Sequence, residues 1–172
     1  KIYNMRVAVL GGGYAGLLTA KQLESTLPED VDLVLVDDTG EHLVQHELHR
    51  AIRIPEFVDA ISVPLPELLD RTTVRTDTVD NIDRAEREGA LTSGETLAYD
   101  VVAICLGAET AYYGLDSVRE HSTPLKCLED AATIRREFLQ VVDGRTGTVA
   151  VGGAGLSGIQ VAGELAAFAR EE

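Results

Sequence analysis

The stretch RVAVLGGGYAGLLTAKQL, residues 6–23, decides the fold of this chain. It opens with an uninterrupted apolar run, which predicts a strand over residues 6–10 that is buried on both faces. Helical spacing follows over residues 15–27 and ends at Pro28. The pattern GxGxxG lies between the two, and it carries information only when a strand precedes it and a helix follows it. Both conditions are met here.

Each of the three glycines in the GxGxxG pattern is needed for a physical reason. Gly11 permits the tight turn, Gly13 lets a pyrophosphate approach the backbone, and Gly16 lets the helix and the strand pack closely. Tyr14 and Ala15 fall at the start of the helix, where unpaired N–H groups and the positive end of the helix dipole attract phosphate. The turn therefore predicts a dinucleotide site.

An acidic residue stands where such a site needs one. The branched apolar run over residues 31–36 predicts a second parallel strand, and Asp37 follows it directly. A carboxylate in this position can accept hydrogen bonds from both ribose hydroxyls and would repel a 2′-phosphate. We therefore expect Asp37 to bind the adenosine ribose.

The same strand–turn–helix pattern returns near the end of the chain, as TVAVGGAGLSGIQVAGELA over residues 148–166. We expect a strand over residues 148–151 and a helix over residues 156–169. The glycine pattern is repeated by Gly153, Gly155 and Gly158. The sequence thus predicts a second dinucleotide turn.

The residues between the two turns predict an α/β fold. The segments that we expect are a short helix near 43–52, strands over 72–83, 90–97 and 100–106, and a helix over 128–142. The predicted architecture is a Rossmann-like dinucleotide-binding fold, and the resemblance described below implies that it is of the FAD/NAD(P)-binding kind. It has a mainly parallel sheet, helices on both faces and a small antiparallel β addition.

Composition narrows the possible partners. The net charge is −14, and only three of the fifteen basic residues are lysine. A surface this acidic disfavours nucleic acid as a partner, because phosphate contacts need clustered Lys and Arg. An acidic, lysine-poor surface is also typical of halophilic proteins, although an ordinary acidic protein is the alternative. Cys105 and Cys127 form neither a CxxC pair nor a zinc pattern, which fits a reduced, intracellular protein.

Several stretches together resemble one family of flavoproteins. The matching segments include AVLGGGYAGLLTAKQL, LVLVDD, ISVPLPELL, TVDNID and VAVGGAGLSGIQVAGELA, and the longest is LAYDVVAICLGAETAYYGLDSVREHSTPLKCLEDAATIRREFL. The chain resembles the type II NADH dehydrogenases (NADH:quinone oxidoreductases), which are flavoproteins with two dinucleotide-binding sites. Leu106 stands where the family usually has threonine, and Gln160 where it commonly has glutamate.

The resemblance implies roles for particular residues. The residues implied for FAD are Gly11, Gly13, Tyr14, Ala15, Gly16, Asp37, Val79, Leu106 and Gly107. Within this set, the Val79 backbone would meet the adenine, and Leu106 and Gly107 would lie beside the flavin. The residues implied for NADH are Gly153, Gly155, Ser157, Gly158 and Glu164. No metal site is implied.

The resemblance also implies an activity and a location. Hydride would pass from NADH to FAD, and electrons would then pass to a quinone at the membrane. The enzyme would be cytoplasmic, peripheral to the inner face of the cell membrane through a C-terminal region that this chain does not contain, and a homodimer. We expect residues 1–145 to be the first segment of the FAD domain and 146–172 the start of the inserted NAD domain. As a fragment, the chain should bind FAD weakly or not at all and should show no turnover.

Three alternatives remain open. Sulfide:quinone and other FAD/NAD-linked reductases share the fold, and some carry a cysteine near the position of Cys127. A flavin-free nucleotide-binding or interaction module would belong to a different class. His42, His46 and His49 could meet a metal if they lay on one helix, but HELH is not the HExxH pattern of zinc proteins.

Overall fold

A computed structural model describes residues 5–144 and 147–171. They fall into two compact units. Unit 1 contains the described residues of Lys1–His42 and Val63–Ala108, and unit 2 contains those of Leu43–Ser62 and Glu109–Glu172. The first glycine turn belongs to unit 1 and the second belongs to unit 2.

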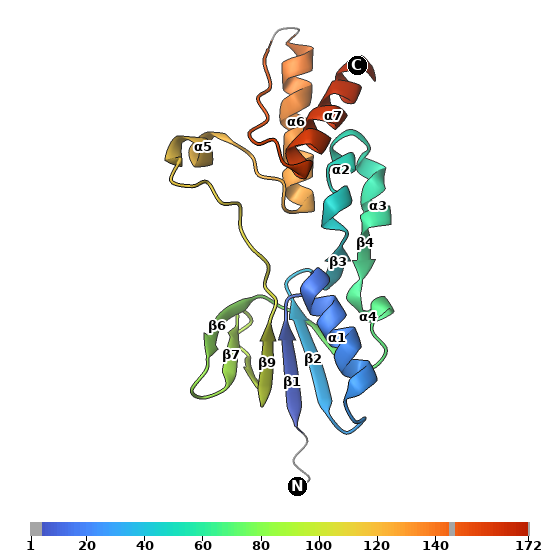
Figure 1. Cartoon of the computed structure of the whole chain (residues 1–172), viewed down its shortest axis with the longest axis vertical. Coiled ribbons are helices and arrows are strands. Elements are labelled where there is room, and N and C mark those ends of the chain that lie inside the picture. The colour runs from blue at the N-terminus through green and yellow to red at the C-terminus, as the bar shows by residue number, and fades with distance from the viewer. Residues whose placement is uncertain (1–4, 145–146, 172) are drawn as a thin grey trace. The chain divides into compact units, whose positions relative to one another are not determined.

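A four-stranded parallel sheet forms the centre of unit 1 (Figure 1). Its strands, in spatial order, are β5 (Thr73–Thr76), β2 (Asp32–Asp37), β1 (Arg6–Leu10) and β9 (Val101–Ile104). Because all four run in one direction, their carboxyl ends meet at one edge of the sheet. In an open α/β sheet, ligands bind outside this edge.

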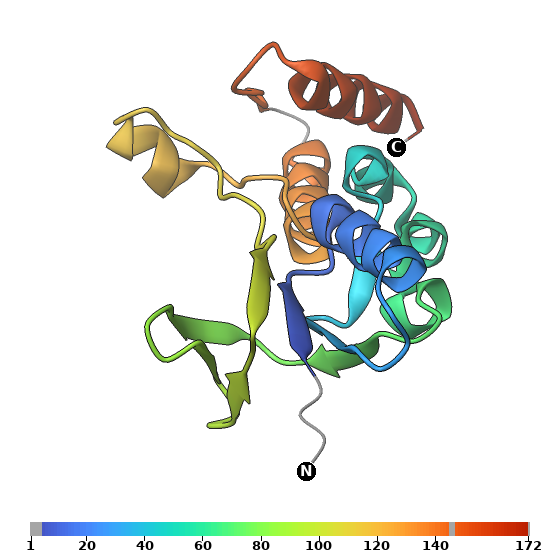
Figure 2. The same cartoon turned by 60° about the horizontal axis from the view of Figure 1, so that its bottom comes forward.

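Side-chain alternation in the strands creates two apolar cores. Val9 and Leu35 point to the face covered by α1 (Tyr14–Thr26) and α4 (Leu65–Leu68), where Leu17 and Ala20 are also buried. Figure 2 shows α1 lying along the sheet. The alternate positions, among them Leu10 and Val36, point to the opposite face. This alternation is the period-2 rule of a strand buried on both sides.

The opposite face is covered by a second sheet, and here the prediction of helices on both faces is corrected. Three antiparallel strands form this second sheet: β6 (Val79–Asp83), β7 (Glu88–Leu91) and β8 (Thr96–Ala98). They bring Leu91, Leu97 and Tyr99 against the apolar residues of the parallel sheet. A small antiparallel sheet with one apolar face can cover the face of a parallel sheet as well as a helix can. The α/β class, with a parallel sheet and an antiparallel addition, is confirmed.

Unit 2 is mainly helical. Its long helices are α6 (Leu128–Asp143) and α7 (Leu156–Glu171). Its shorter elements are η1 (Gln45–Glu47), α2 (Arg50–Arg53), η2 (Pro55–Phe57), α3 (Val58–Ile61) and α5 (Asp116–His121). The paired strands β3 (Glu41–Leu43) and β4 (Ser62–Pro64) contain the points at which the chain leaves and re-enters unit 1.

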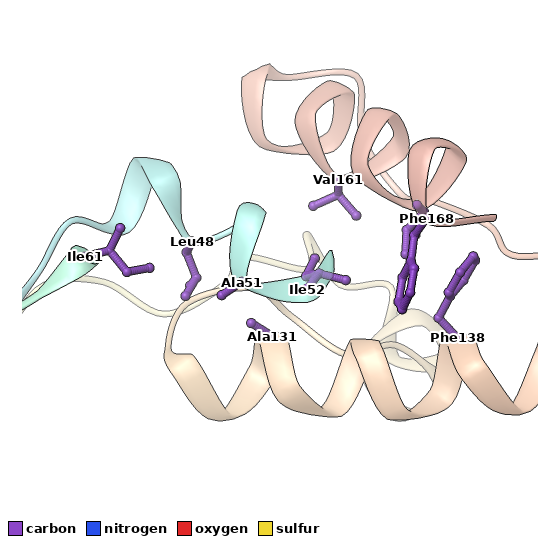
Figure 3. Packing of buried hydrophobic residues seen from close by; sticks show 9 residues of the cluster. Leu48, Ala51, Ile52, Ile61, Ala131, Phe138, Val161 and Phe168 are labelled. Atoms are coloured by element: carbon purple, nitrogen blue, oxygen red, sulfur yellow. The ribbon is translucent and has the colours of Figure 1, made fainter. Parts of the chain in front are cut away.

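One buried cluster joins α2, α6 and α7 (Figure 3). Phe138 of α6 and Phe168 of α7 stack with ring centroids 5.2 Å apart. The guanidinium of Arg135 lies 4.6 Å from the centre of the Phe168 ring and donates to the carbonyls of Ile52 (3.0 Å) and Arg53 (2.8 Å). These are the last carbonyls of α2, which its own backbone leaves unpaired.

Three predicted elements differ from the structure. The strand expected over residues 72–83 is divided into β5 of the parallel sheet and β6 of the antiparallel sheet. The helix near 43–52 is broken into the single turns η1 and α2. The strand over residues 148–151 was predicted wrongly: no strand is present there, and Val149 and Val151 are largely exposed. A strand is defined by pairing, and no described segment pairs with these residues. None of the helices in the described part of the chain has both the length and the apolar character needed to cross a bilayer.

Glu24 connects the end of α1 to the loop before β5. Its carboxylate accepts hydrogen bonds from the backbone N–H groups of Arg71 (2.9 Å), Thr72 (2.8 Å) and Asp70 (3.2 Å), and from the Thr72 hydroxyl (2.7 Å). Partial burial raises the pKa of Glu24, but the hydrogen bonds from Arg71, Thr72 and Asp70 together lower it more, so the net shift is downward. The ionised form is therefore favoured in the folded state.

We expect Glu24→Gln to lower the free energy of unfolding by about 1 kcal/mol at pH 7, because an amide is a weaker acceptor than a carboxylate. The pKa is lower in the folded than in the unfolded chain, so the stabilisation is complete above the unfolded value. It should disappear as the pH falls through the lower folded value. Urea unfolding of both proteins from pH 7 down to acid tests this expectation. Glu29→Gln, an exposed neighbour, is the control, and equal effects of the two substitutions at pH 7 would contradict the role of Glu24.

Candidate functional site

The first glycine turn joins β1 to α1 by close backbone contacts. Gly11 has a φ of +101° and donates its N–H to the Val36 carbonyl at 2.7 Å. A side chain on Gly11 would overlap the Cys105 carbonyl, and one on Gly16 would overlap the carbonyl oxygen of Gly11. Both positions therefore exclude every residue except glycine.

Gly13 is different, because nothing lies near the place where its side chain would project. It is exposed, and an added Cβ would meet no atom within 4 Å. Its backbone is extended, with φ −65° and ψ −173°, and its carbonyl accepts the Leu17 N–H at 2.9 Å. Tyr14 and Ala15, which begin α1, are exposed beside it. Glycine is not needed here for packing, so the open space suits a group that approaches the backbone from outside.

Asp37 lies against this turn at the carboxyl end of β2. Its Oδ2 accepts the N–H of Gly12 at 2.7 Å. Its Oδ1 accepts the Thr39 N–H (3.0 Å), the Thr39 hydroxyl (2.7 Å) and the Gly40 N–H (3.0 Å). Three of these donors share Oδ1, whereas Oδ2 accepts one, so Oδ2 keeps an acceptor position for a further hydroxyl. The ribose role of Asp37 stays a prediction.

The residues predicted beside the flavin reach the same edge of the sheet. Cys105 follows β9 and donates its N–H to the Leu10 carbonyl at 2.7 Å. The Leu106 Cα lies 3.1 Å from the position that a Gly11 Cβ would occupy, and its side chain is 53% exposed. Gly107 has a φ of +79° and open space around it. Leu106 and Gly107 thus flank the first turn, on the side opposite to Asp37 in strand order.

Val79 begins β6 and is half-buried against the core under the antiparallel sheet. Asp77, two residues before it, donates its N–H to the Asp37 carbonyl at 2.9 Å, which fixes this segment near the end of β2. Hydrogen bonds from Ser93, Thr92 and the Thr78 N–H hold the pKa of Asp77 below its usual value. The carboxylate of Asp77 is therefore ionised at neutral pH.

Sequence reasoning missed two site residues, Gly12 in the turn and His42 beside it. The glycine pattern gives Gly12 no role, yet a side chain there would overlap Leu65 and lie 3.0 Å from Asp37 Oδ2. His42 was considered only as a metal ligand. It is 6% exposed, and its Nδ1 lies 3.0 Å from the Gly12 carbonyl oxygen. Its ring meets the Tyr14 ring edge to face, with centroids 4.7 Å apart. Three consecutive glycines were the available signal for Gly12. For His42 the available signal was the resemblance, because the flavoprotein family commonly has a histidine at this position.

His46 and His49, the other two histidines considered as metal ligands, do not form a metal site together with His42. His46 is exposed, and the Nδ1 of His49 lies 3.1 Å from the carbonyl oxygen of His46. No group of three or more His, Cys, Asp or Glu side chains that could hold a metal ion is present in residues 5–144 and 147–171. The structure therefore gives no support to a histidine metal site.

The second glycine turn repeats the contact between the last and the first glycine of the first turn, although an added Cβ at Gly153 would meet nothing within 4 Å. Gly153 has a φ of +115°, and a side chain on Gly158 would overlap the Gly153 carbonyl oxygen, as Gly16 would overlap Gly11. The Gly155 carbonyl accepts the Ile159 N–H at 3.1 Å, and an added Cβ at Gly155 would meet nothing within 4 Å. Ser157 is exposed in the first turn of α7. The repeat predicted from sequence is thus also a repeat of backbone geometry.

Glu164 does not lie at this second turn. It is nine residues beyond Gly155 on α7, which is about 13 Å along a helix. Its carboxylate accepts the Nε–H of Arg53 at 2.6 Å, and its side chain is only 13% exposed. Arg53 also donates to Glu171 at 2.9 Å. These contacts give Glu164 a structural role in the packing of α2 against α7, and its role in cofactor binding stays a prediction.

Cys127 is exposed and begins α6. Asp130 accepts the backbone N–H groups of Lys126 (2.7 Å) and Cys127 (3.1 Å), which completes a capping box at this helix start. Its place at the helix cap explains why a residue of this size stands here, and a catalytic role for the sulfur of Cys127 is not needed.

A parallel sheet with a glycine turn at its carboxyl edge, followed by a second glycine turn with a matching backbone contact, is typical of a dinucleotide-binding fold. The sequence matches the family of pyridine nucleotide-disulphide oxidoreductases over residues 5–171, and the chain belongs to this family of enzymes. FAD is typical of the family.

Within this family, the chain is similar to several quinone reductases. The chain is 27% identical to the type II NADH:quinone oxidoreductase of Staphylococcus haemolyticus, over 93% of this chain and 42% of that protein. It is 30% identical to the demethylphylloquinone reductase NdbB of Synechocystis sp., again over 93% and 42%. The chain therefore spans about two fifths of the length of these relatives. Among solved structures, NDH2 from Plasmodium falciparum in complex with NADH superposes with a TM-score of 0.75 at 16% identity, over 96% of this chain and 37% of that one.

Gly13, which has open space around it, and Gly16, which has none, should differ in how much a substitution by alanine lowers stability. Gly16→Ala should lower the free energy of unfolding by about 1–3 kcal/mol, because the new Cβ overlaps the Gly11 carbonyl. Gly13→Ala should change it by less than about 0.5 kcal/mol, because the space is open and the backbone is extended. Urea unfolding measures both. Equal stability of the two variants would show that the close contact at Gly16 does not exist.

Proposed function

We propose that this chain provides the FAD-binding turn and the first part of the NADH-binding turn of an FAD-dependent NADH:quinone oxidoreductase. The observation that carries the proposal is the repeated turn. Gly11 and Gly153 share a left-handed backbone, Gly16 and Gly158 share a contact that admits no side chain, and each turn starts a helix of at least 13 residues. Relatives named as NADH:quinone oxidoreductases support the choice of reaction.

The residues of the first turn fit a bound FAD. Gly13 leaves a cradle that a Cβ would fill, and α1 begins at this point with no acidic residue in its first turn. The helix N-terminus and the open backbone together favour a diphosphate. We assign Asp37 to the ribose, the Val79 backbone to the adenine, and Leu106 with Gly107 to the side of the flavin.

The residues of the second turn fit a pyridine nucleotide by the same argument. Gly155 leaves the equivalent open cradle, and α7 begins with no acidic residue in its first turn. The Ser157 hydroxyl is exposed at this helix start and can donate to a phosphate. We assign Gly153, Gly155, Ser157 and Gly158 to NADH.

When bound, FAD would supply a carrier for the hydride (two electrons and one proton) of NADH; two electrons and two protons, one of them from solvent, would then convert a quinone into a quinol. The chain's contribution is to hold the two diphosphates at the two turns, so that the reacting rings are presented in fixed positions. Residues 1–145 would supply the first segment of the FAD domain and residues 146–172 the start of the NAD domain.

Further parts of the proposal concern partners and location. Quinone reduction places the enzyme at the inner face of the cell membrane, as a peripheral protein. A homodimer is also proposed. The exposed Val149, Val151, Leu156 and Ile159 beside the second turn support burial of this face by further protein.

The two turns can be tested separately by one matched pair of variants. We expect FAD to shift the backbone amide NMR signals of residues 11–16 and NADH those of residues 153–158. Gly13→Ala should weaken FAD binding at least about tenfold and leave NADH unchanged, because its methyl displaces a diphosphate from the backbone. Gly155→Ala should do the reverse. Weakening of both ligands by either variant, or of neither, would contradict two separate sites.

The reaction is tested on the protein isolated from its source at its native length. Anaerobic NADH should bleach the visible absorption of the flavin, and a soluble quinone should restore it. Loss of colour with NADH that only ferricyanide reverses would leave an NADH dehydrogenase and remove the quinone from the proposal. A protein isolated and reconstituted without any flavin would overturn the proposal as a whole.

A further inference from the structure

The peptide groups on both sides of Gly12 are held from within unit 1. The Gly12 N–H is donated to Asp37 Oδ2 at 2.7 Å, and the Gly12 carbonyl oxygen lies 3.0 Å from His42 Nδ1. Gly12 is buried, whereas the next residue, Gly13, is exposed. The bend from buried to exposed backbone therefore occurs at the peptide bond between Gly12 and Gly13.

The contact with His42 fixes the proton on one ring nitrogen. A carbonyl oxygen can only accept a hydrogen bond, so Nδ1 of His42 must carry a proton and donate it. The ring is 6% exposed and is held by the edge-to-face contact with Tyr14. An imidazole buried against a carbonyl and an aromatic ring has little freedom to turn away.

This hydrogen bond determines where the Gly13 N–H points. A trans peptide group is planar, and its C=O and N–H point in opposite directions. With the Gly12 carbonyl held toward buried His42, the Gly13 N–H must point away from the interior. None of the described residues accepts a hydrogen bond from this N–H. The backbone of Gly13 is open on its side-chain side as well, because an added Gly13 Cβ would meet no atom within 4 Å.

We propose that His42 is a positioning residue for the diphosphate. Its Nδ1–H holds the Gly12 carbonyl and thereby aims the Gly13 N–H at the diphosphate that binds the first turn. This inference rests on the proposed FAD site and adds a residue to it. His42 touches neither the diphosphate nor the reacting atoms; it acts through one peptide group. Asp37 holds the preceding peptide group through the Gly12 N–H, so the two side chains fix consecutive planes of the turn.

Two substitutions separate the hydrogen bond from the ring. His42→Asn keeps an N–H donor near the position of Nδ1 and loses the ring. His42→Phe keeps an aromatic ring against Tyr14 and loses the donor. FAD and ADP are the probes, and their dissociation constants are measured by NMR titration of the backbone amides, which also detects weak binding. We expect His42→Phe to bind both ligands about tenfold more weakly, and His42→Asn to remain within about twofold of the original chain.

Glu24→Gln is the control for stability alone. Glu24 lies near the other end of α1, away from the turn, so this variant should unfold more readily and still bind FAD and ADP with unchanged affinity. A loss of affinity that merely follows the loss of stability across the three variants would make His42 a packing residue and overturn the proposal.

A measurement on the unsubstituted chain covers the case in which His42→Phe does not fold. Nitrogen-15 NMR should show a proton on Nδ1 of His42 and a coupling across the hydrogen bond to the Gly12 carbonyl carbon. Added ADP should shift the Gly13 amide proton. A bare Nδ1 would overturn the inference. If FAD and ADP bind equally well to all variants, only the role of His42 falls. If the unsubstituted chain binds neither ligand at residues 11–16, the proposed FAD site falls as well.

Discussion

The close approach of two backbones, Gly16 to the carbonyl of Gly11, is the contact on which the first turn depends. It allows β1 to pass into α1 through only Gly11, Gly12 and Gly13, so that the helix begins at the carboxyl edge of the sheet. Because this contact leaves no room for a side chain, the position cannot vary without a change in the path of the chain. Gly158 and Gly153 make the same contact in unit 2. Two turns built on one constraint are better evidence for two nucleotide sites than either glycine pattern alone.

The charge of the protein makes the placement of backbone dipoles important. The net charge is −14, and Asp37 and Asp77 lie at the edge of the sheet that the dinucleotide would approach. Four hydrogen bonds from the chain, three of them to Oδ1, partly neutralise the carboxylate of Asp37. Attraction for a diphosphate must then come from the N–H groups at the start of α1. The affinity for a diphosphate therefore depends on the direction in which these N–H groups point.

The sequence predicted the parts of the molecule that depend on local pattern. The bounds of β1, and those of α1 and β2 to within one residue, followed from apolar runs, spacing and helix-ending residues, as did the glycine turn and the place of Asp37 at the end of β2. Contacts between distant segments were not accessible. Examples are the packing of Leu97 against the parallel sheet, the ion pair of Glu164 with Arg53, and the hydrogen bond of His42 to Gly12. The strand over residues 148–151 failed for a related reason, since an apolar run shows that a segment can enter a sheet but does not supply its partner.

Arg135 has a consequence for how unit 2 loses its structure. One guanidinium closes the end of α2 through two carbonyls and covers the Phe168 ring of α7, while its own backbone belongs to α6. No one of these three helices can unfold alone without leaving buried carbonyls or an aromatic face unpartnered. Amide protons in all three should therefore exchange with solvent in a single cooperative opening rather than helix by helix. The helix that carries the second glycine turn thus draws its rigidity from segments that are far away in the sequence.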